Sequence, residues 1–513
     1  MRAQADPEPT HPVERAVLPA PAPTRSIPPA DRDAERPWSP ILVPLLRRPW
    51  LWPSALTLAL TLLQADRAQL WRDELATWSA ASRPPADLLR MLGNIDAVSG
   101  PYYLLMSGWI RVFGDSVIAL RLPSALAMMA AAGLTAVLGA RVFNERVGMV
   151  AGLLFAVVPS TSRYGQEARS YALVTLLAVG ATLLLLRALE RPTWTRWAAY
   201  AGAVAGLGLA HLVAVTLVAA HAVAVGLAWH RGDRRPLGWM TACGSAGTVL
   251  APLALFSRGQ QAQQLGWVRS PTISAVVDLP GGITQAAAVG GLLAGFAAVA
   301  AVNTGRRGAT LAACLLFPSG ALLAASLVSP LWVPRYLVFT VPFGCLLSAA
   351  ALATTGLRTT ILVTLLVAVL GAPAQASLRR THEPTRSHVD YRAAVRVVVA
   401  HDRPGDAIAY SGRGVADKML ETAVAYLARG DRPHDVLAVR DPVRSADLEA
   451  DECAEPARCL AGTARVWLLV PGHRADPLQR LPAANAAALR DAFRVEQTWR
   501  VPGLTVALLT RTS

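Results

Sequence analysis

An eight-residue polar segment, Tyr164-Gly165-Gln166-Glu167-Ala168-Arg169-Ser170-Tyr171, is the most informative stretch of this chain. It lies between two apolar runs that are long enough to cross a bilayer. Ionisable groups are costly at such a position, so they are functional candidates there. Arg169 has paired planar donors that suit phosphate, whereas Glu167 would face another side of a helix and hold a different group. The alternative is an internal ion pair of these two residues that fixes a loop.

Two carboxylates follow closely on the first apolar run, in Trp71-Arg72-Asp73-Glu74. A carboxylate held at a membrane surface can take a proton from an acceptor hydroxyl during group transfer. A helix N-terminus whose acids favour the helix dipole would explain the same pair. A further acid, Asp96, precedes Tyr102 and Tyr103, which can stack on a sugar or belong to the aromatic belt of the membrane interface.

Other polar side chains lie near the ends of later apolar runs. Arg335, in Pro334-Arg335-Tyr336, is a second candidate phosphate clamp, although an arginine at a span end can also extend to lipid headgroups. His211 divides a run that is too long for one crossing, and it is either a polar helix end or a ligand or base. A glutamine-rich stretch at 260–264 precedes Trp267 and could contact an acceptor.

The composition indicates which elements must position these residues. The 513-residue chain is 53% hydrophobic and only 16% charged, with a mean hydropathy of +0.37, whereas soluble chains are about a quarter charged. The apolar runs predict a polytopic α-helical membrane protein with about eleven transmembrane helices. The expected spans are 49–65, 117–140, 146–160, 170–187, 196–211, 213–229, 237–256, 284–303, 309–328, 337–355 and 359–376. The net charge of +15 is spread between these runs, so membrane topology and anionic lipid explain it better than nucleic acid.

Alternate connections between the predicted spans are rich in arginine. The basic positions are Arg47, Arg48, Arg141, Arg146, Arg187, Arg191, Arg196, Arg231, Arg234, Arg235, Arg306, Arg307 and Arg358. The positive-inside rule places them in the cytoplasm. We therefore predict a multi-pass plasma (inner) membrane protein with a cytoplasmic N-terminus and an extracytoplasmic C-terminal domain. The polar segments described above, including a first external loop at 66–116, then all fall on the extracytoplasmic face.

The two ends of the chain differ from its apolar middle. Residues 1–40 are rich in proline, alanine and charged residues and predict a disordered cytoplasmic tail, with no apolar segment placed as in a signal peptide. Residues 385–513 alternate helix-like and strand-like segments, which predicts a small α/β domain. The expected helices are 391–400, 418–428 and 483–493, and the expected strands are 407–410, 466–470 and 504–509.

Two of the five cysteines lie in this C-terminal domain. Cys453 and Cys459 can close a small disulfide loop if the domain faces an oxidising compartment. No histidines accompany them, so a zinc site is disfavoured. The other three cysteines lie inside apolar runs and are expected to be small core residues.

With these features the chain resembles bacterial membrane glycosyltransferases of the C-type fold, in the protein O-mannosyltransferase-like group. The resemblance covers about 49–376, and the transmembrane glycosyltransferase domain is expected at 41–376. The matching features, in chain order, are Asp73-Glu74, Asp96 ahead of Tyr102-Tyr103, Arg121-Leu122-Pro123-Ser124, the 164–171 segment, and Arg335-Tyr336 ahead of Pro342.

The resemblance implies transfer of a sugar from a polyprenyl-phosphate donor to an acceptor hydroxyl on the extracytoplasmic face, with inversion at the anomeric carbon. It assigns the general base to Asp73, with Glu74 beside it. The expected donor-phosphate contacts are Arg169, Arg335, Tyr336, Tyr164, Gln166 and Glu167. The expected acceptor or sugar contacts are Asp96, Tyr102, Tyr103, His211 and Trp267.

Several finer points stay open in the sequence. Relatives often carry a histidine just before the tyrosine pair, where this chain has Val98-Ser99-Gly100-Pro101, so a divalent metal is neither required nor excluded. Mannose is the first expected sugar, and arabinofuranose or another pentose is the second. The acceptor is a glycan, a glycolipid or a protein.

Two other function classes compete with a transferase. A transporter or flippase of lipid-linked sugars would favour repeated halves and mid-span polar groups, whereas here the polar residues gather at one face. A scaffold that binds a partner through its external domain would leave Asp73, Glu167 and Arg169 without a role.

Overall fold

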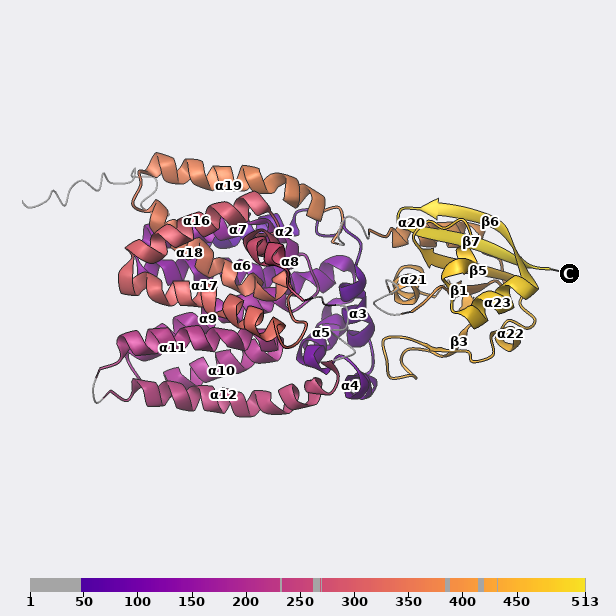
Figure 1. Ribbon diagram of the computed structural model, residues 1–513, viewed down its shortest axis with the longest axis horizontal. Helices are drawn as coiled ribbons and strands as arrows, with labels where there is room; N and C mark the ends of the chain where they lie inside the picture. Colours follow the sequence, from indigo (N-terminus) through magenta and orange to yellow (C-terminus); the bar gives the residue numbers. More distant parts are fainter. Residues whose placement is uncertain are drawn as a thin grey trace, which may run out of the picture. The chain divides into compact units, whose positions relative to one another are not determined.

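The apolar runs of the sequence fold into a bundle of helices (Figure 1). The computed structural model describes residues 48–512 except 231–232, 262–267, 269, 383–387, 414–418 and 431, so the predicted tail at 1–40 lies outside the described residues. The bundle helices are α2 (Leu51–Leu62), α6 (Val117–Val142), α7 (Glu145–Val157), α8 (Pro159–Gly165), α9 (Tyr171–Glu190), α10 (Trp194–Ala210), α11 (Leu217–Ala228), α12 (Arg235–Arg258), α16 (Ala287–Asn303), α17 (Gly305–Ser326), α18 (Val341–Leu352) and α19 (Leu357–Leu378). Each predicted span overlaps at least one of them.

Length decides which of these helices can cross a membrane alone. Among the described residues, six helical segments are long and apolar enough, and α7 with α8 forms a seventh, bent candidate. The chain is therefore a polytopic helical membrane protein with six or seven candidate spans. Three shorter apolar helices, Leu51–Leu62, Leu212–Ala228 and Ala287–Asn303, fall below the roughly 20 residues that one crossing needs. The topology of about eleven spans stays a prediction.

A proline determines where the polar segment 164–171 lies. Proline disfavours the helical conformation of the residue before it, and Val158 is accordingly extended, with ψ 130°. The next helix, α8, turns from α7 by 65°. Because α8 ends at Gly165 and α9 begins at Tyr171, most of the polar segment forms a tight connection between two helices.

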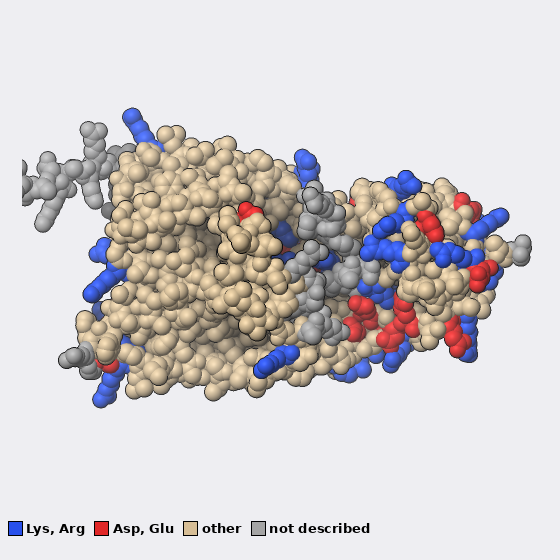
Figure 2. All heavy atoms as spheres, in the orientation of Figure 1, with Lys and Arg blue, Asp and Glu red and all other residues tan. Residues whose placement is uncertain are grey.

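Small residues let the bundle helices approach one another, as is usual in membranes. A Cβ on Gly148 of α7 would lie 2.2 Å from the carbonyl oxygen of Ala136 in α6. Figure 2 shows the helical part as a broad surface with few charged side chains, which gather mainly at its edges, while red and blue side chains mix over the C-terminal part. This charge distribution fits a bundle that is surrounded by lipid.

The first loop, 66–116, is itself largely helical. It contains α3 (Arg72–Ala81), α4 (Pro85–Asn94), the 3-10 helix η2 (Ala97–Ser99) and α5 (Gly100–Phe113). Leu75, Leu88 and Tyr103 of this loop belong to one buried apolar cluster with Leu420 and Leu504 of the C-terminal part. The loop is therefore held in place by apolar packing, which gives its polar residues fixed positions.

The C-terminal part is a mixed α/β region. Its helices are α20 (Tyr391–His401), α21 (Leu420–Ala428), α22 (Pro456–Cys459) and α23 (Ala483–Ala492). Its main strands are β2 (His434–Asp435), β1 (Ala407–Tyr410), β5 (Arg465–Pro471), β7 (Leu504–Arg511) and β6 (Phe493–Val501), given in their order across one sheet. β1 pairs in parallel with β2 and β5, while β7 is antiparallel to β5 and β6. A short β3 (Ala438–Arg440) pairs with β4 (Asp451–Glu452).

Apolar residues alternate between two cores on the two faces of this sheet, as the strand period of two requires. Trp467 and Leu469 pack in the core that contains α20 and α21, and Leu468 and Val470 pack in the core that contains Leu489 of α23. Burial on both faces explains why 466–470 reads as a continuous apolar run.

The prediction of a helix at 483–493 was wrong at its last residue, because Phe493 already begins β6. The sequence did not predict β6 at all. This edge strand has mostly exposed side chains, so it lacks the apolar pattern on which strand predictions depend.

Candidate active site

The two carboxylates of the first loop lie in the first turn of α3. Trp71 is the residue before the helix, and its backbone N–H donates to the Glu74 carboxylate at 3.4 Å, which caps the helix start. The position therefore suits the helix dipole, as the simpler interpretation of the sequence expected. However, the two side chains diverge: Glu74 is fully buried, while the side chain of Asp73 keeps 12% of its surface exposed.

Asp73 lies among arginines and tyrosines that come from distant parts of the chain. Its carboxylate is 3.6 Å from Nη2 of Arg335 and 3.6 Å from Nε of Arg72. Arg335, at the start of the 3-10 helix η4 (Pro334–Thr340), also donates through Nε to the hydroxyl of Tyr171 at 3.1 Å. The fold thus brings the first loop, the start of α9 and the start of η4 to one place.

Arg169 is held beside this group by a chain of hydrogen bonds. It donates to the hydroxyl of Tyr103 at 3.1 Å, and that hydroxyl donates in turn to Asp96. Arg169 also interacts electrostatically with Asp73. We call Asp73, Arg335, Tyr171, Arg169 and Tyr103 the Asp73 cluster.

Asp96 contacts the Asp73 cluster through Tyr103, whose hydroxyl donates to its carboxylate. It accepts from Ser99 at 3.0 Å as well as from Tyr103, and its backbone is left-handed, with φ +57°. Burial raises the pKa of Asp96, while Arg169 and the two hydrogen bonds oppose that rise. These contacts make Asp96 a residue that orients Tyr103 and Arg169.

Glu74 belongs to a second, fully buried group. Arg121 donates to its two carboxylate oxygens at 2.8 and 2.6 Å, and the backbone N–H of Ala168 donates at 3.0 Å. Arg121 also donates to the carbonyls of Ala65 and Ala68, at 2.6 and 2.9 Å. Burial would raise the pKa of Glu74, but the charge and hydrogen bonds of Arg121 hold that pKa well below its usual range.

Glu167 completes this buried group, with Arg163 as its partner. Arg163 Nη1 lies 2.5 Å from the carboxylate of Glu167, four residues further along the chain, and the indole of Trp71 donates to the other oxygen at 3.0 Å. Burial raises the pKa of Glu167 against the effect of Arg163. An internal Glu–Arg pair does fix this loop, but its arginine is Arg163 and not Arg169.

His382, just after α19, packs against the same group. Its Nδ1 is 3.5 Å from the Glu74 carboxylate, and its carbonyl accepts from Arg163 at 3.1 Å. We call Glu74, Arg121, Glu167, Arg163 and His382 the Glu74 cluster. The ring of Trp71 lies near both clusters, with the guanidinium of Arg163 at 5.2 Å and that of Arg335 at 5.8 Å from the ring centroid.

The remaining predicted residues lie around these two clusters. Gln166 donates to the carbonyls of Thr61 and Leu63, both at 2.9 Å, so it ties the loop to the end of α2. His211 lies 4.8 Å from Tyr336 and 5.9 Å from Tyr171 between ring centroids. Tyr164 packs on Tyr171 at 5.3 Å.

Two predicted acceptor or sugar contacts, Tyr102 and Trp267, are not assigned to either cluster. Tyr102 is buried, and its hydroxyl has no hydrogen-bond partner among the described residues. Trp267 lies outside the described residues. From the same polar loop, Gln260 accepts from the backbone of Ala97 at 2.8 Å, next to Asp96.

Sequence reasoning missed the roles of Arg163 and His382. The spacing of Arg163 and Glu167, four residues apart, is a usable signal for an ion pair on one helix face. No local signal marks His382, because it lies far along the chain from Glu74. Within the described ranges, no group of three or more His, Cys, Asp or Glu side chains could hold a metal ion.

Comparisons with known proteins agree with this architecture. Residues 101–257 match the family model of dolichyl-phosphate-mannose-protein mannosyltransferases. None of the curated proteins matches the sequence. The chain is similar to ArnT from Cupriavidus metallidurans, both in the apo state and bound to undecaprenyl phosphate. Each comparison gives 13% identity, a TM-score of 0.56, and coverage of 89% of this chain and 97% of that chain.

A further similarity is to the oligosaccharyltransferase from Archaeoglobus fulgidus in the apo form, at 12% identity and a TM-score of 0.44, over 85% of this chain and 70% of that chain. The likeness to ArnT shows the C-type fold. The resemblance that the sequence predicted is thereby confirmed.

Proposed function

We propose that this chain, a membrane glycosyltransferase of the dolichyl-phosphate-mannose-protein mannosyltransferase type, moves one sugar from a polyprenyl-phosphate donor to an acceptor hydroxyl. The observation that carries the proposal is the placement of the Asp73 carboxylate 3.6 Å from the guanidinium of Arg335. A base for the acceptor and a cation for the departing phosphate are the two charges that this reaction needs.

In this mechanism Asp73 takes the proton of the acceptor hydroxyl. The hydroxyl oxygen forms a bond to the anomeric carbon as the bond from that carbon to the phosphate oxygen breaks. The electron pair of the broken bond stays on the polyprenyl phosphate, whose growing charge is met by Arg335 and Arg169. Attack from the side opposite the phosphate inverts the anomeric configuration. Asp73 then releases its proton to solvent, which its partly exposed side chain can reach.

Glu74 does not serve as the base in this proposal. Its oxygens are occupied by Arg121 and by a backbone N–H, and the side chain is fully buried. Its role is to position α3, and thereby Asp73. Glu167 and Gln166 are likewise positioning residues, because their polar atoms are bound to the protein itself.

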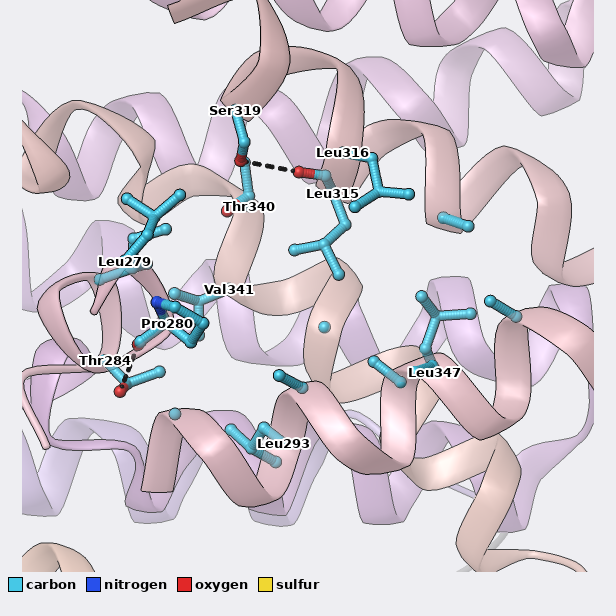
Figure 3. A pocket seen from close by; sticks show the side chains of 18 residues that line it. Leu279, Pro280, Thr284, Leu293, Leu315, Leu316, Ser319, Thr340, Val341 and Leu347 are labelled. Carbon is cyan, nitrogen blue, oxygen red and sulfur yellow. Dashed lines mark hydrogen bonds between the residues drawn. The ribbon is translucent and has the colours of Figure 1, made fainter. Parts of the chain in front are cut away.

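An apolar cavity beside the Asp73 cluster suits the prenyl chain of the donor. It has a volume of about 460 Å³, and aliphatic side chains such as Leu279, Leu293 and Leu315 surround it (Figure 3). η4 carries Arg335 near its start and Thr340, a residue of the cavity wall, at its end. A phosphate at Arg335 can therefore continue into a lipid chain in this cavity. The ArnT structure bound to undecaprenyl phosphate supports a donor of this class.

Mannose is our first choice for the sugar, because the matching family model is that of mannosyltransferases. Arabinofuranose or another pentose is the alternative. The acceptor is a glycan, a glycolipid or a protein that presents a free hydroxyl. A lipid-linked sugar flippase remains the competing function, but it gives no reason for a carboxylate next to the phosphate clamp.

We place the Asp73 cluster and the C-terminal part on the extracytoplasmic side, because the arginine-rich connections lie at the other helix ends. Cys453 and Cys459 are joined by a disulfide, with Cα atoms 6.6 Å apart, and such bonds persist in oxidising compartments. Peptide mapping of the native protein without reductant should recover the two cysteines as one linked pair. Free thiols at both positions would argue for the opposite orientation.

The function is tested by transfer of radiolabelled sugar from polyprenyl-phosphate mannose in membranes that contain the wild type or Asp73→Asn. Label that moves to lipid, glycan or protein with the wild type alone supports the class, the donor and the base. Transfer from a pentose donor only would replace mannose. No transfer from either donor, together with donor movement across the bilayer of proteoliposomes, would favour the flippase.

A further inference from the structure

A second cavity lies at the far ends of the helices from the Asp73 cluster. It has a volume of about 470 Å³, and Arg141, Arg235, Arg306, Arg307 and Glu190 line it together with aliphatic side chains. α9 runs from Tyr171, in the Asp73 cluster, to Glu190, at this cavity. At 1.5 Å per residue, the length of α9 separates the two places by roughly 30 Å. The proposed transfer reaction uses none of these side chains.

Positive charge is in surplus in this cavity. Arg141 pairs with Glu190, the one carboxylate in the lining. Arg235 lies 3.4 Å from Asp233 and donates to the carbonyl of Ala228 at 3.0 Å. Its buried Nε has no hydrogen-bond partner among the described residues.

Arg306 and Arg307 add two charges from the first turn of α17. Within the described part of the chain neither has a carboxylate within 4.0 Å, whereas Arg141 and Arg235 do. Four arginines and one glutamate therefore line one hollow, and Asp233 pairs with one of the four, so two positive charges are left over. A bound anion would satisfy this charge, since guanidinium groups bind phosphate through paired charge-assisted bonds.

The walls of the cavity are apolar below this charged rim. Leu186 and Leu189 of α9, Leu227 of α11 and Leu311 of α17 supply them. Trp229, just after α11, is 54% exposed, as is typical of a tryptophan at the level of lipid headgroups. A charged rim above an aliphatic wall fits a molecule with a phosphate head and a hydrocarbon tail better than it fits a free anion.

The positive-inside rule alone does not account for this arrangement. Arg187 and Arg358 also lie at this end of the helices and are exposed, as Arg306 and Arg307 are, but they do not line the cavity. An arginine that only sets topology can point into water anywhere along a short loop. Here arginines of three helices, α6, α12 and α17, converge on one hollow.

We propose that this arginine cavity binds the phosphate headgroup of an acidic diacyl phospholipid, with one acyl chain along its aliphatic wall. The site is separate from the sugar donor site. A lipid bound there contacts α6, α9, α11, α12 and α17 together, so it stabilises their packing.

The test uses the purified full-length protein, delipidated in an uncharged detergent, with phosphatidylglycerol or phosphatidylcholine of the same acyl chains. Native mass spectrometry should show one retained phosphatidylglycerol per chain and at least tenfold weaker retention of phosphatidylcholine. The double variant Arg306→Gln/Arg307→Gln should retain phosphatidylglycerol at least tenfold more weakly. The matched control Arg187→Gln/Arg358→Gln removes the same charge at the same end and should bind like the wild type.

Equal retention of the two lipids, or equal loss in both double variants, would overturn the proposal.

Glycerol phosphate tests whether a free anion binds in place of the lipid. If it displaces the phospholipid at equal concentration, the cavity is a phosphate site and not a lipid site. If the Arg306/Arg307 variant does not fold, as judged by size-exclusion chromatography, the melting temperature of the wild type with each lipid tests the proposal instead. Its melting temperature should rise with phosphatidylglycerol and not with phosphatidylcholine, and an equal rise with both would contradict the site. No sugar donor is present, so the outcome is independent of the transfer reaction.

Discussion

Asp73 and Glu74 are adjacent in the first turn of α3, yet their carboxylates have very different surroundings. Both oxygens of Glu74 receive hydrogen bonds of 2.6 to 3.0 Å from Arg121 and Ala168, in a fully buried site. The ion pairs of Asp73 with Arg72 and Arg335 are looser, at 3.6 Å, and 12% of its side chain is exposed. The same contrast extends to their neighbours: the side chain of Arg335 beside Asp73 is 21% exposed, whereas that of His382 beside Glu74 is fully buried.

The comparison distinguishes a carboxylate that could act as a base from one that holds the structure in place. A carboxylate whose oxygens are saturated by a buried arginine cannot take a proton from a substrate without breaking that pair, which costs several kcal/mol. A carboxylate that is held loosely between two guanidinium groups can be reached by a substrate without breaking a buried ion pair. We therefore expect the two clusters to respond differently to the same kind of substitution, one in turnover and the other in folding.

Asp73→Asn should have the largest effect. Loss of the general base is expected to lower the turnover number by about 10²- to 10⁴-fold, while the melting temperature stays near that of the wild type because the side chain is isosteric. Sugar transfer at saturating donor and acceptor measures it. Asp87→Asn, a matched change in α4 of the same loop, should keep full activity. If Asp73→Asn retains turnover, the base is another acid and the contrast between the clusters fails.

Glu74→Gln should act on folding instead. Removing one partner of a buried ion pair leaves Arg121 uncompensated, which typically costs about 3–5 kcal/mol. The variant is expected to accumulate poorly in membranes and to melt at a lower temperature. Turnover per folded molecule should change far less than in Asp73→Asn. A stable Glu74→Gln protein without activity would instead give Glu74 a part in the chemistry.

Arg335→Gln should weaken donor use and, because this guanidinium also meets the charge that grows on the departing phosphate, should lower turnover as well. A charge-assisted hydrogen bond contributes about 1.5–3 kcal/mol, so the donor concentration for half-maximal rate should rise roughly 10- to 150-fold. Initial rates at varied donor concentration give this value, and Arg67→Gln in the first loop is the matched control. An unchanged donor dependence would mean that Arg335 only extends to lipid headgroups and orders Tyr171.

The helices of the bundle could be predicted from the sequence because apolar runs of about 20 residues have few other solutions in lipid. Every predicted span overlaps a helix. The polar segment 164–171 forms the connection between α8, which begins at Pro159, and α9, as its polarity predicts. The number of true crossings could not be fixed. Helices such as α2 and α16 are shorter than a bilayer, and their depth depends on packing and not on their own residues.

The sequence pointed to the candidate residues themselves, but it did not predict which side chains each of them contacts. Asp73 and Glu74 share one local sequence, and only contacts with Arg121 and with the backbone of Ala168 distinguish them. Arg169 and Glu167 were expected either to hold different substrate groups or to pair with each other, whereas the fold turns them toward Tyr103 and Arg163 respectively. The i,i+4 spacing of Arg163 and Glu167 is a local signal for their pair, but the contacts of Glu74 with Arg121 and of Arg169 with Tyr103 depend on long-range packing, which no local pattern encodes.

His382 gives the smallest and most specific test of the Glu74 cluster. Burial, with the positive charges of Arg163 and Arg121, lowers the pKa of His382 to about 3, although Glu74 favours its protonation. In the unfolded chain a histidine has a pKa of about 6.5. Between these values the unfolded state binds a proton that the folded state does not bind. The stability that His382 contributes is therefore full above about pH 6.5 and falls as the pH decreases, by at most about 1.4 kcal/mol per pH unit.

His382→Gln should remove this part of the pH dependence. Melting temperatures measured from pH 7 to pH 5 should fall less steeply in the variant than in the wild type. His401→Gln, a change at an exposed position, should keep the wild-type slope. This window lies above the ordinary glutamate range near pH 4.3, so Glu74, whose pKa is depressed further by Arg121, contributes little to the difference. Parallel curves for the wild type and His382→Gln would mean that His382 is solvated, and the Glu74 cluster would then be more open than its contacts indicate.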